Sequence, residues 1–131
     1  MLGNLQVGLQ VGLQVMERHG DGMLTNTMRQ ELVDGLLGIF SDNILQIILY
    51  GSVAREDNTS ESDVDIAIVI KEDMDDRTRE KFIIWSADMD LRYDRVFSIV
   101  DIQEKNLEKW GSILPFYKNV QKEGIVLWKA A

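Results

Sequence analysis

The sequence predicts one small α/β (α+β) domain, in which helices flank a mixed sheet of three to four strands. Its 131 residues are enough for one compact domain and too few for two ordinary ones. Apolar residues make up 45% of the chain and charged residues 27%, which is typical of a globular protein. Short apolar runs alternate with segments of helical periodicity, and this alternation predicts the mixed architecture.

Residues 1–22 stand apart from this pattern. From Leu5 to Met16 the chain repeats LQVG, LQVG and LQVM, a four-residue period that fits neither a strand nor a helix cleanly. Three copies are also too short for a solenoid. We expect residues 1–22 to be a flexible N-terminal extension and residues 23–131 to form the domain. An extra strand or a partner-binding tail is the alternative.

The first predicted helix runs from Thr25 to Phe40. Thr27, followed three residues later by Gln30, is typical of a helix start. Apolar residues recur at helical spacing and predict one buried face, formed by Met28, Leu32, Leu36, Leu37 and Phe40.

Two buried strands are predicted next, from Ile44 to Tyr50 and over the segment DVDIAIVI that ends at Ile70. The later elements follow from similar patterns, with Pro115 opening the last helix and Gly124 ending it. These elements are a helix over 77–89, a strand over 95–102, helices over 103–110 and 115–123, and a short strand over 125–128.

Charge and composition exclude several classes of function. The net charge of −8 disfavours broad binding to nucleic-acid backbones or to anionic membranes. No apolar run approaches the roughly 20 residues that span a bilayer. The chain has no cysteine and a single histidine, His19, so thiolate and histidine-based zinc chemistry are not expected. A cytoplasmic location fits the missing cysteines.

Two aspartates mark the beginning of the second strand. Side chains alternate along a strand, so Asp63 and Asp65 share one face while Val64 and Ile66 point into a core. Two neighbouring carboxylates repel each other unless a cation lies between them. Carboxylate oxygens suit Mg²⁺, which keeps several waters and often binds substrate phosphates as well. Two such ions about 4 Å apart could activate an attacking oxygen and stabilise a leaving one.

Gly51 and Ser52 directly follow the first strand and supply a complementary feature. A turn into a short helix would present free backbone N–H groups, and glycine allows a phosphate to approach closely. Arg55, one turn further, could face the same anion or pair with an aspartate. Each feature alone has a plainer explanation, namely a simple turn, a solvated strand end and a surface ion pair. Together they predict a triphosphate site beside a metal site, which is what nucleotidyl transfer needs.

The combination resembles the minimal nucleotidyltransferases (MNT family) of the DNA polymerase beta superfamily. The residues that carry the resemblance are Gly51-Ser52-Val53-Ala54-Arg55 and Ser62-Asp63-Val64-Asp65. The likeness covers most of residues 23–131, including the ending EGIVLW. Glu56 departs from it, because the family usually has glycine after the arginine.

The resemblance implies a small nucleotidyltransferase fold and a metal-dependent transfer of NMP from an NTP to a hydroxyl group, with ATP and Mg²⁺ (or Mn²⁺) expected. Gly51, Ser52 and Arg55 would bind the triphosphate, and Asp63 and Asp65 the metal. A third carboxylate is implied on a later strand. Asp94 is preferred over Asp101 and would also act as general base toward the acceptor.

The resemblance also implies a class of partner. Minimal members often pair with a helical HEPN protein in toxin–antitoxin modules, so the acceptor could lie on a partner protein; a homodimer is also left open. The alternative is a catalytically weak or inactive module of the same fold that binds a partner or senses a nucleotide.

Overall fold

A computed structural model describes residues 24–55 and 63–131, with Ser52 described by its backbone alone. The expected N-terminal extension, Glu56 and Ser62 lie outside the described residues. Within the described part, no helix is both long and apolar enough to cross a membrane.

The centre of the fold is a four-stranded mixed sheet with the strand order β3-β2-β1-β4. The predicted mixed sheet is therefore confirmed. β1 pairs antiparallel with both β2 and β4, whereas β2 and β3 run parallel. The strands are β1 (Ile44–Tyr50), β2 (Val64–Ile70), β3 (Phe97–Gln103) and β4 (Ile125–Lys129).

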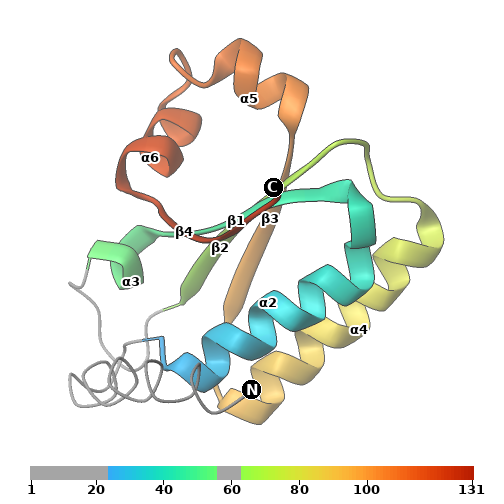
Figure 1. Cartoon of the computed structure of the whole chain (residues 1–131). Helices are drawn as coiled ribbons and strands as arrows, with labels where there is room; N and C mark the ends of the chain where they lie inside the picture. Colours follow the sequence, from blue (N-terminus) through green and yellow to red (C-terminus); the bar gives the residue numbers. More distant parts are fainter. Residues whose placement is uncertain (1–23, 56–62) are drawn as a thin grey trace.

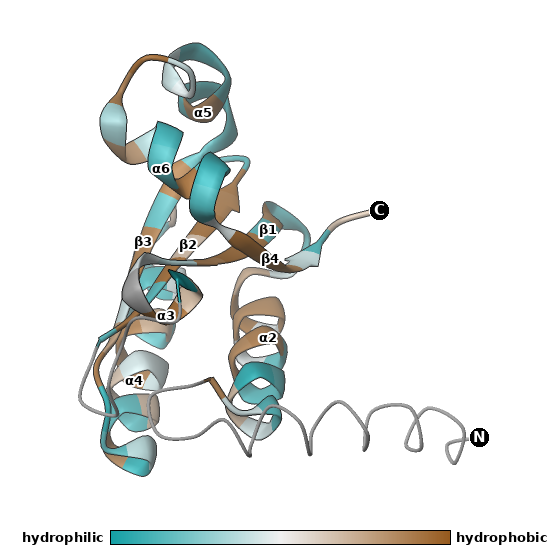
Figure 2. Ribbon diagram, turned by 90° about the vertical axis from the view of Figure 1, so that its left-hand side faces the viewer, coloured by the Kyte–Doolittle hydropathy of each residue, from teal (hydrophilic) through white to brown (hydrophobic). Residues whose placement is uncertain are grey.

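Helices cover both faces of this sheet (Figure 1). α2 (Asn26–Phe40) and α4 (Asp76–Tyr93) lie side by side on one face, and α5 (Glu104–Trp110) and α6 (Pro115–Glu123) lie on the other. Figure 2 shows the same layers from the side. The short helix α3 (Gly51–Arg55) follows β1 at one end of the sheet, and a 3-10 turn, η1 (Ser41–Asn43), joins α2 to β1.

The central strand β2 is buried on both faces because its side chains alternate between two cores. Val64, Ile66, Ile68 and Ile70 belong to the larger core, which includes the apolar face of α2. Ala67 and Val69 belong to a smaller core, together with Val120 of α6. Each fully buried valine or isoleucine contributes about 1.5–3 kcal/mol to stability. Val64 and Ile66 thus lie in the core as predicted, and Asp65 lies on the face of the smaller core.

The start of α2 differs from the prediction. The Thr25 hydroxyl accepts a hydrogen bond from the backbone N–H of Met28 at 3.1 Å, so Thr25 is the N-cap residue. Thr27 is exposed within the first turn. The helix start that Thr27 and Gln30 indicated is therefore two residues too late, because Thr25 already satisfies a free N–H group of this helix end.

α4 is longer than its predicted range of 77–89. Asp75 caps its start by accepting a hydrogen bond from the Thr78 N–H at 2.7 Å. Its last turn is held to α2, since Arg92 forms an ion pair with Glu31 and the Tyr93 hydroxyl donates a hydrogen bond to the same carboxylate. The extra turn delays the third strand, which begins at residue 97 rather than 95.

Candidate active site

The predicted site residues gather at one end of the sheet, where β1 ends and β2 and β3 begin. Tyr50, the last residue of β1, lies opposite Asp65, and Asp65 lies beside Ser98 of β3. Paired residues of neighbouring strands project to the same face of a sheet. Three oxygen-bearing side chains therefore form a row across the strands at this level.

Gly51 lies where the predicted phosphate-binding turn meets the predicted metal-binding carboxylates. Its φ of +76° is a left-handed conformation that glycine adopts without steric cost. A Cβ at this position would overlap Oδ2 of Asp65 and would lie 3.0 Å from its Cγ. The Asp65 side chain therefore packs directly against the backbone of the Gly-Ser turn, and any larger residue at position 51 would displace it.

The Asp65 carboxylate lies in an unfavourable electrostatic environment. Burial raises its pKa, the negative charge of Asp63 raises it further, and the charge of Arg55 opposes both effects. A cation bound between Asp63 and Asp65 would relieve this repulsion. Two carboxylates are also suitable ligands for Mg²⁺, and water and phosphate oxygens would complete its coordination. The residues present thus fit a divalent metal ion.

Arg55 lies close enough to Asp65 for their charges to interact, and it also bridges two helices. Its Nη1 atom is 3.3 Å from Oε1 of Glu123, the last residue of α6. Both side chains are more than a third exposed, so this ion pair contributes about 1 kcal/mol or less. Arg55 thus brings a positive charge to the end of α3, beside Asp65.

Arg95 belongs to the same surroundings and was missed by the sequence reasoning. Its guanidinium is half-buried, and burial lowers its pKa while the charge of Asp63 raises it. The two arginines thus lie near different aspartates, Arg55 near Asp65 and Arg95 near Asp63. The signal in the sequence was a cation directly after the candidate Asp94, at the entrance to the third strand.

Neither candidate for the third carboxylate lies in the row of Asp65. Asp94 is exposed at the C-cap of α4, where it adopts a left-handed φ of 52°, three residues before β3. Asp101 pairs with Ile68, three register positions beyond Asp65 and on the opposite face. Over residues 24–55 and 63–131, no group of three or more acidic, histidine or cysteine side chains could hold a metal ion. The role given to Asp94 stays a prediction.

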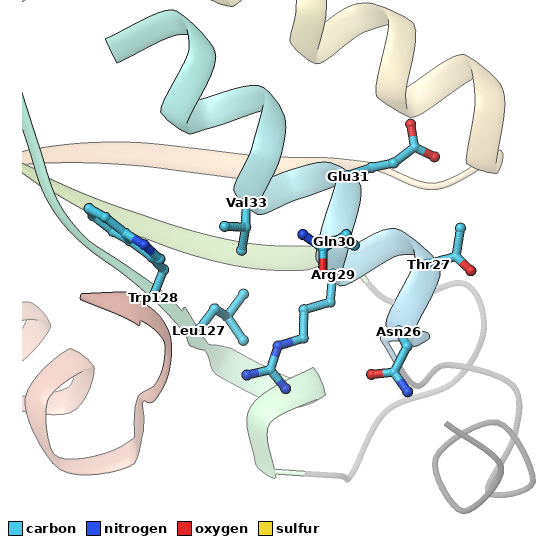
Figure 3. A pocket seen from close by; sticks show the side chains of 8 residues that line it. All are labelled: Asn26, Thr27, Arg29, Gln30, Glu31, Val33, Leu127 and Trp128. Atoms are coloured by element: carbon cyan, nitrogen blue, oxygen red, sulfur yellow. The ribbon is translucent and has the colours of Figure 1, made fainter. Parts of the chain in front are cut away.

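A separate cavity of about 730 Å³ lies between the first turns of α2 and strand β4 (Figure 3). Its wall combines the apolar side chains of Val33, Leu127 and Trp128 with polar groups that include Arg29. None of its lining residues is a predicted site residue.

Fold and site together define a small nucleotidyltransferase, and comparison with known proteins places the chain in a family. Residues 36–130 match the family model described as Polymerase beta, Nucleotidyltransferase. The chain belongs to this family, and its resemblance to the minimal nucleotidyltransferases is confirmed.

Two proteins of Methanocaldococcus jannaschii are similar in sequence. The chain is 35% identical over 102 residues to "Putative protein adenylyltransferase MJ0604", covering 76% of this chain and 93% of that protein. It is 38% identical over 60 residues to "Putative protein adenylyltransferase MJ0141", covering 46% of this chain and 61% of that protein.

Solved structures show the same fold. One, described as a toxin-antitoxin with AMP-PNP, is 19% identical with a TM-score of 0.54 and covers 78% of this chain and 73% of its own. Another, a mutant of the toxin-antitoxin MntA-HpeT, is 22% identical with a TM-score of 0.52 and covers 77% of this chain and 72% of its own. At these identities the likeness concerns the fold alone.

Proposed function

We propose that this nucleotidyltransferase transfers AMP from ATP to a hydroxyl group on a partner protein, in a reaction that requires Mg²⁺ or Mn²⁺. The observation that carries the proposal is the packing of Asp65 against Gly51. It brings a glycine turn suited to a phosphate beside a carboxylate pair suited to a metal ion.

Each residue of the site has a distinct part in the proposal. Gly51 and Ser52 offer backbone N–H groups to the triphosphate, and Arg55 contributes positive charge to it. Asp63 and Asp65 hold the divalent cation, which when bound would neutralise charge on the phosphates. This arrangement fixes the α-phosphorus so that an acceptor hydroxyl can attack it and pyrophosphate can leave.

The nature of the acceptor is proposed from the relatives. Two similar proteins are named as protein adenylyltransferases, and two structures with this fold are toxin–antitoxin proteins, one of them with AMP-PNP. We therefore favour a protein acceptor, with a helical HEPN-type toxin as the expected partner. A cytoplasmic setting is part of this proposal, because such a module would act where ATP is abundant.

A labelling experiment tests the proposal. The protein is incubated with ATP labelled in its α-phosphate and with Mg²⁺ or Mn²⁺, in the presence and absence of the protein encoded by the neighbouring gene. We expect label on the neighbour, reduced roughly 100-fold or more by Asp63→Asn because the metal loses one of two carboxylate ligands. Asp101→Asn is the matched control, since Asp101 lies on the opposite face, and it should transfer label within about twofold of the wild type.

A partner-binding or nucleotide-sensing module remains the second candidate. This candidate is favoured because the carboxylates of the described residues form no group of three that could hold a metal ion. A tight complex with the neighbouring protein, combined with no transfer of label under any metal condition, would support this module over the enzyme.

A further inference from the structure

We propose that the site holds a single divalent cation, on Asp63 and Asp65, and that Ser98 occupies the position where a second ion would need a carboxylate. The inference rests on the proposed function, because it concerns the same site. The paired aspartates alone suggested a site for two ions, and we infer that it holds one.

The register of the sheet singles out Ser98. β2 and β3 are parallel, with Val64 beside Phe97 and Asp65 beside Ser98. The side chain of Ser98 therefore leaves the sheet on the same face as Asp65, one strand spacing of about 4.8 Å away. A carboxylate at this position would stand next to Asp65, whereas serine offers only a short neutral hydroxyl.

The neighbour on the other side of Asp65 is also neutral. Tyr50 of β1 lies opposite Asp65 in the antiparallel ladder. The phenol of a tyrosine is an uncharged oxygen group at neutral pH. Asp65 is thus flanked across the sheet by two uncharged oxygen groups, which are weak ligands for Mg²⁺ compared with carboxylates.

The remaining acidic candidates lie elsewhere. Asp101 is three register positions from Ser98, about 10 Å along the strand, and projects from the other face. Asp94 caps α4 outside the strand and is exposed. If Asp63 and Asp65 bridged two ions, the second ion would have no anionic ligand of its own from the described chain.

Ser98 consequently sets the number of ions that the site can hold. One ion can take both aspartates together with water and triphosphate oxygens, which is a common arrangement for Mg²⁺. Adding a carboxylate at position 98 should create a second site without altering the first.

The test counts bound Mn²⁺ by equilibrium dialysis and electron paramagnetic resonance at saturating non-hydrolysable ATP analogue. We expect one Mn²⁺ per chain in the wild type and two in Ser98→Asp, with the second ion bound at least tenfold more tightly than any second ion in Ser98→Asn. Ser98→Asn is the matched control because asparagine has the size of aspartate without its charge. Asp94→Asn should still bind one Mn²⁺, with an affinity within twofold of the wild type.

Several results would overturn the inference. Two tightly bound ions in the wild type, or a tenfold loss of Mn²⁺ affinity in Asp94→Asn, would show that the chain already supplies a third ligand. A single ion in a folded Ser98→Asp would show that position 98 does not face the site. These results leave the proposed function intact, whereas a wild type that binds neither Mn²⁺ nor nucleotide would refute the proposed function as well.

Discussion

Replacing Gly51 by alanine should damage stability and metal binding together. The left-handed φ of +76° costs an alanine about 1–2 kcal/mol. The new Cβ would also overlap the Asp65 carboxylate and lie 3.2 Å from the Asp65 Cβ, close to the backbone of β2. Displacing a packed side chain adds about 1–2 kcal/mol. We therefore expect Gly51→Ala to lower the free energy of unfolding by about 2–4 kcal/mol, and the melting temperature by roughly 10 °C.

The assay pairs thermal and urea unfolding with Mn²⁺ titration in the presence of the non-hydrolysable ATP analogue. Gly38 provides the control, because a Cβ there would have no heavy atom within 4 Å. Gly38→Ala lies inside α2 and should raise stability by up to about 1 kcal/mol through helix propensity, without changing Mn²⁺ affinity.

The Gly51→Ala variant should bind Mn²⁺ at least tenfold more weakly than the wild type, because Asp65 can no longer occupy its place. Wild-type stability together with wild-type Mn²⁺ affinity in Gly51→Ala would show that neither the backbone strain nor the contact with Asp65 has the expected effect. A loss of stability with unchanged affinity would show that the turn is strained but does not position the carboxylate.

Three further substitutions test other parts of the structure. Asp65→Asn should stabilise the metal-free protein at pH 7, because burial and a neighbouring negative charge raise the pKa of Asp65 and its ionised form therefore costs stability. The gain should shrink as the pH falls from 7 toward 4, and urea unfolding that shows the same gain at both values would contradict this. Thr25→Ala should cost about 1 kcal/mol through loss of the helix cap, whereas Thr27→Ala should be nearly neutral; equal losses in chemical denaturation would refute the assigned cap. Gly35→Ala should lower the melting temperature, because its Cβ would lie 2.7 Å from Cζ2 of Trp85 where α2 meets α4, and an unchanged melting curve would show that the indole moves aside freely.

Features that depend on neighbouring residues could be predicted from the sequence. The alternation of Asp65 with Val64 and Ile66 follows directly from strand geometry, and the structure places both apolar residues in the larger core. The helix opened by Pro115 and closed by Gly124 was also predicted correctly, because both ends carry local signals.

Features that depend on distant contacts could not be predicted in the same way. The pairing of Asp65 with Ser98 is fixed by where α4 ends, and that end is held by contacts of Arg92 and Tyr93 with Glu31 on another helix. A local pattern contains no information on such a register. For the same reason the local sequence around Ser98 does not indicate that it lies beside Asp65.

The position of Arg95 depends on the same geometry. The charge that raises its pKa belongs to Asp63, a residue 32 positions earlier in the chain. Its partner could be identified only after the fold had brought the start of β3 beside the start of β2.

The central place of β2 has a consequence for hydrogen exchange. This strand is paired along both edges, and both of its faces are covered, so we expect its amides to exchange with solvent only when the whole domain unfolds. α3 contains five residues, and a helix this short depends on tertiary contacts for its stability. Asp65 is therefore attached to the most protected backbone of the domain, whereas the turn over Gly51–Arg55 can open locally. A bound nucleotide should accordingly slow exchange over Gly51–Arg55 far more than over Ile66–Ile70.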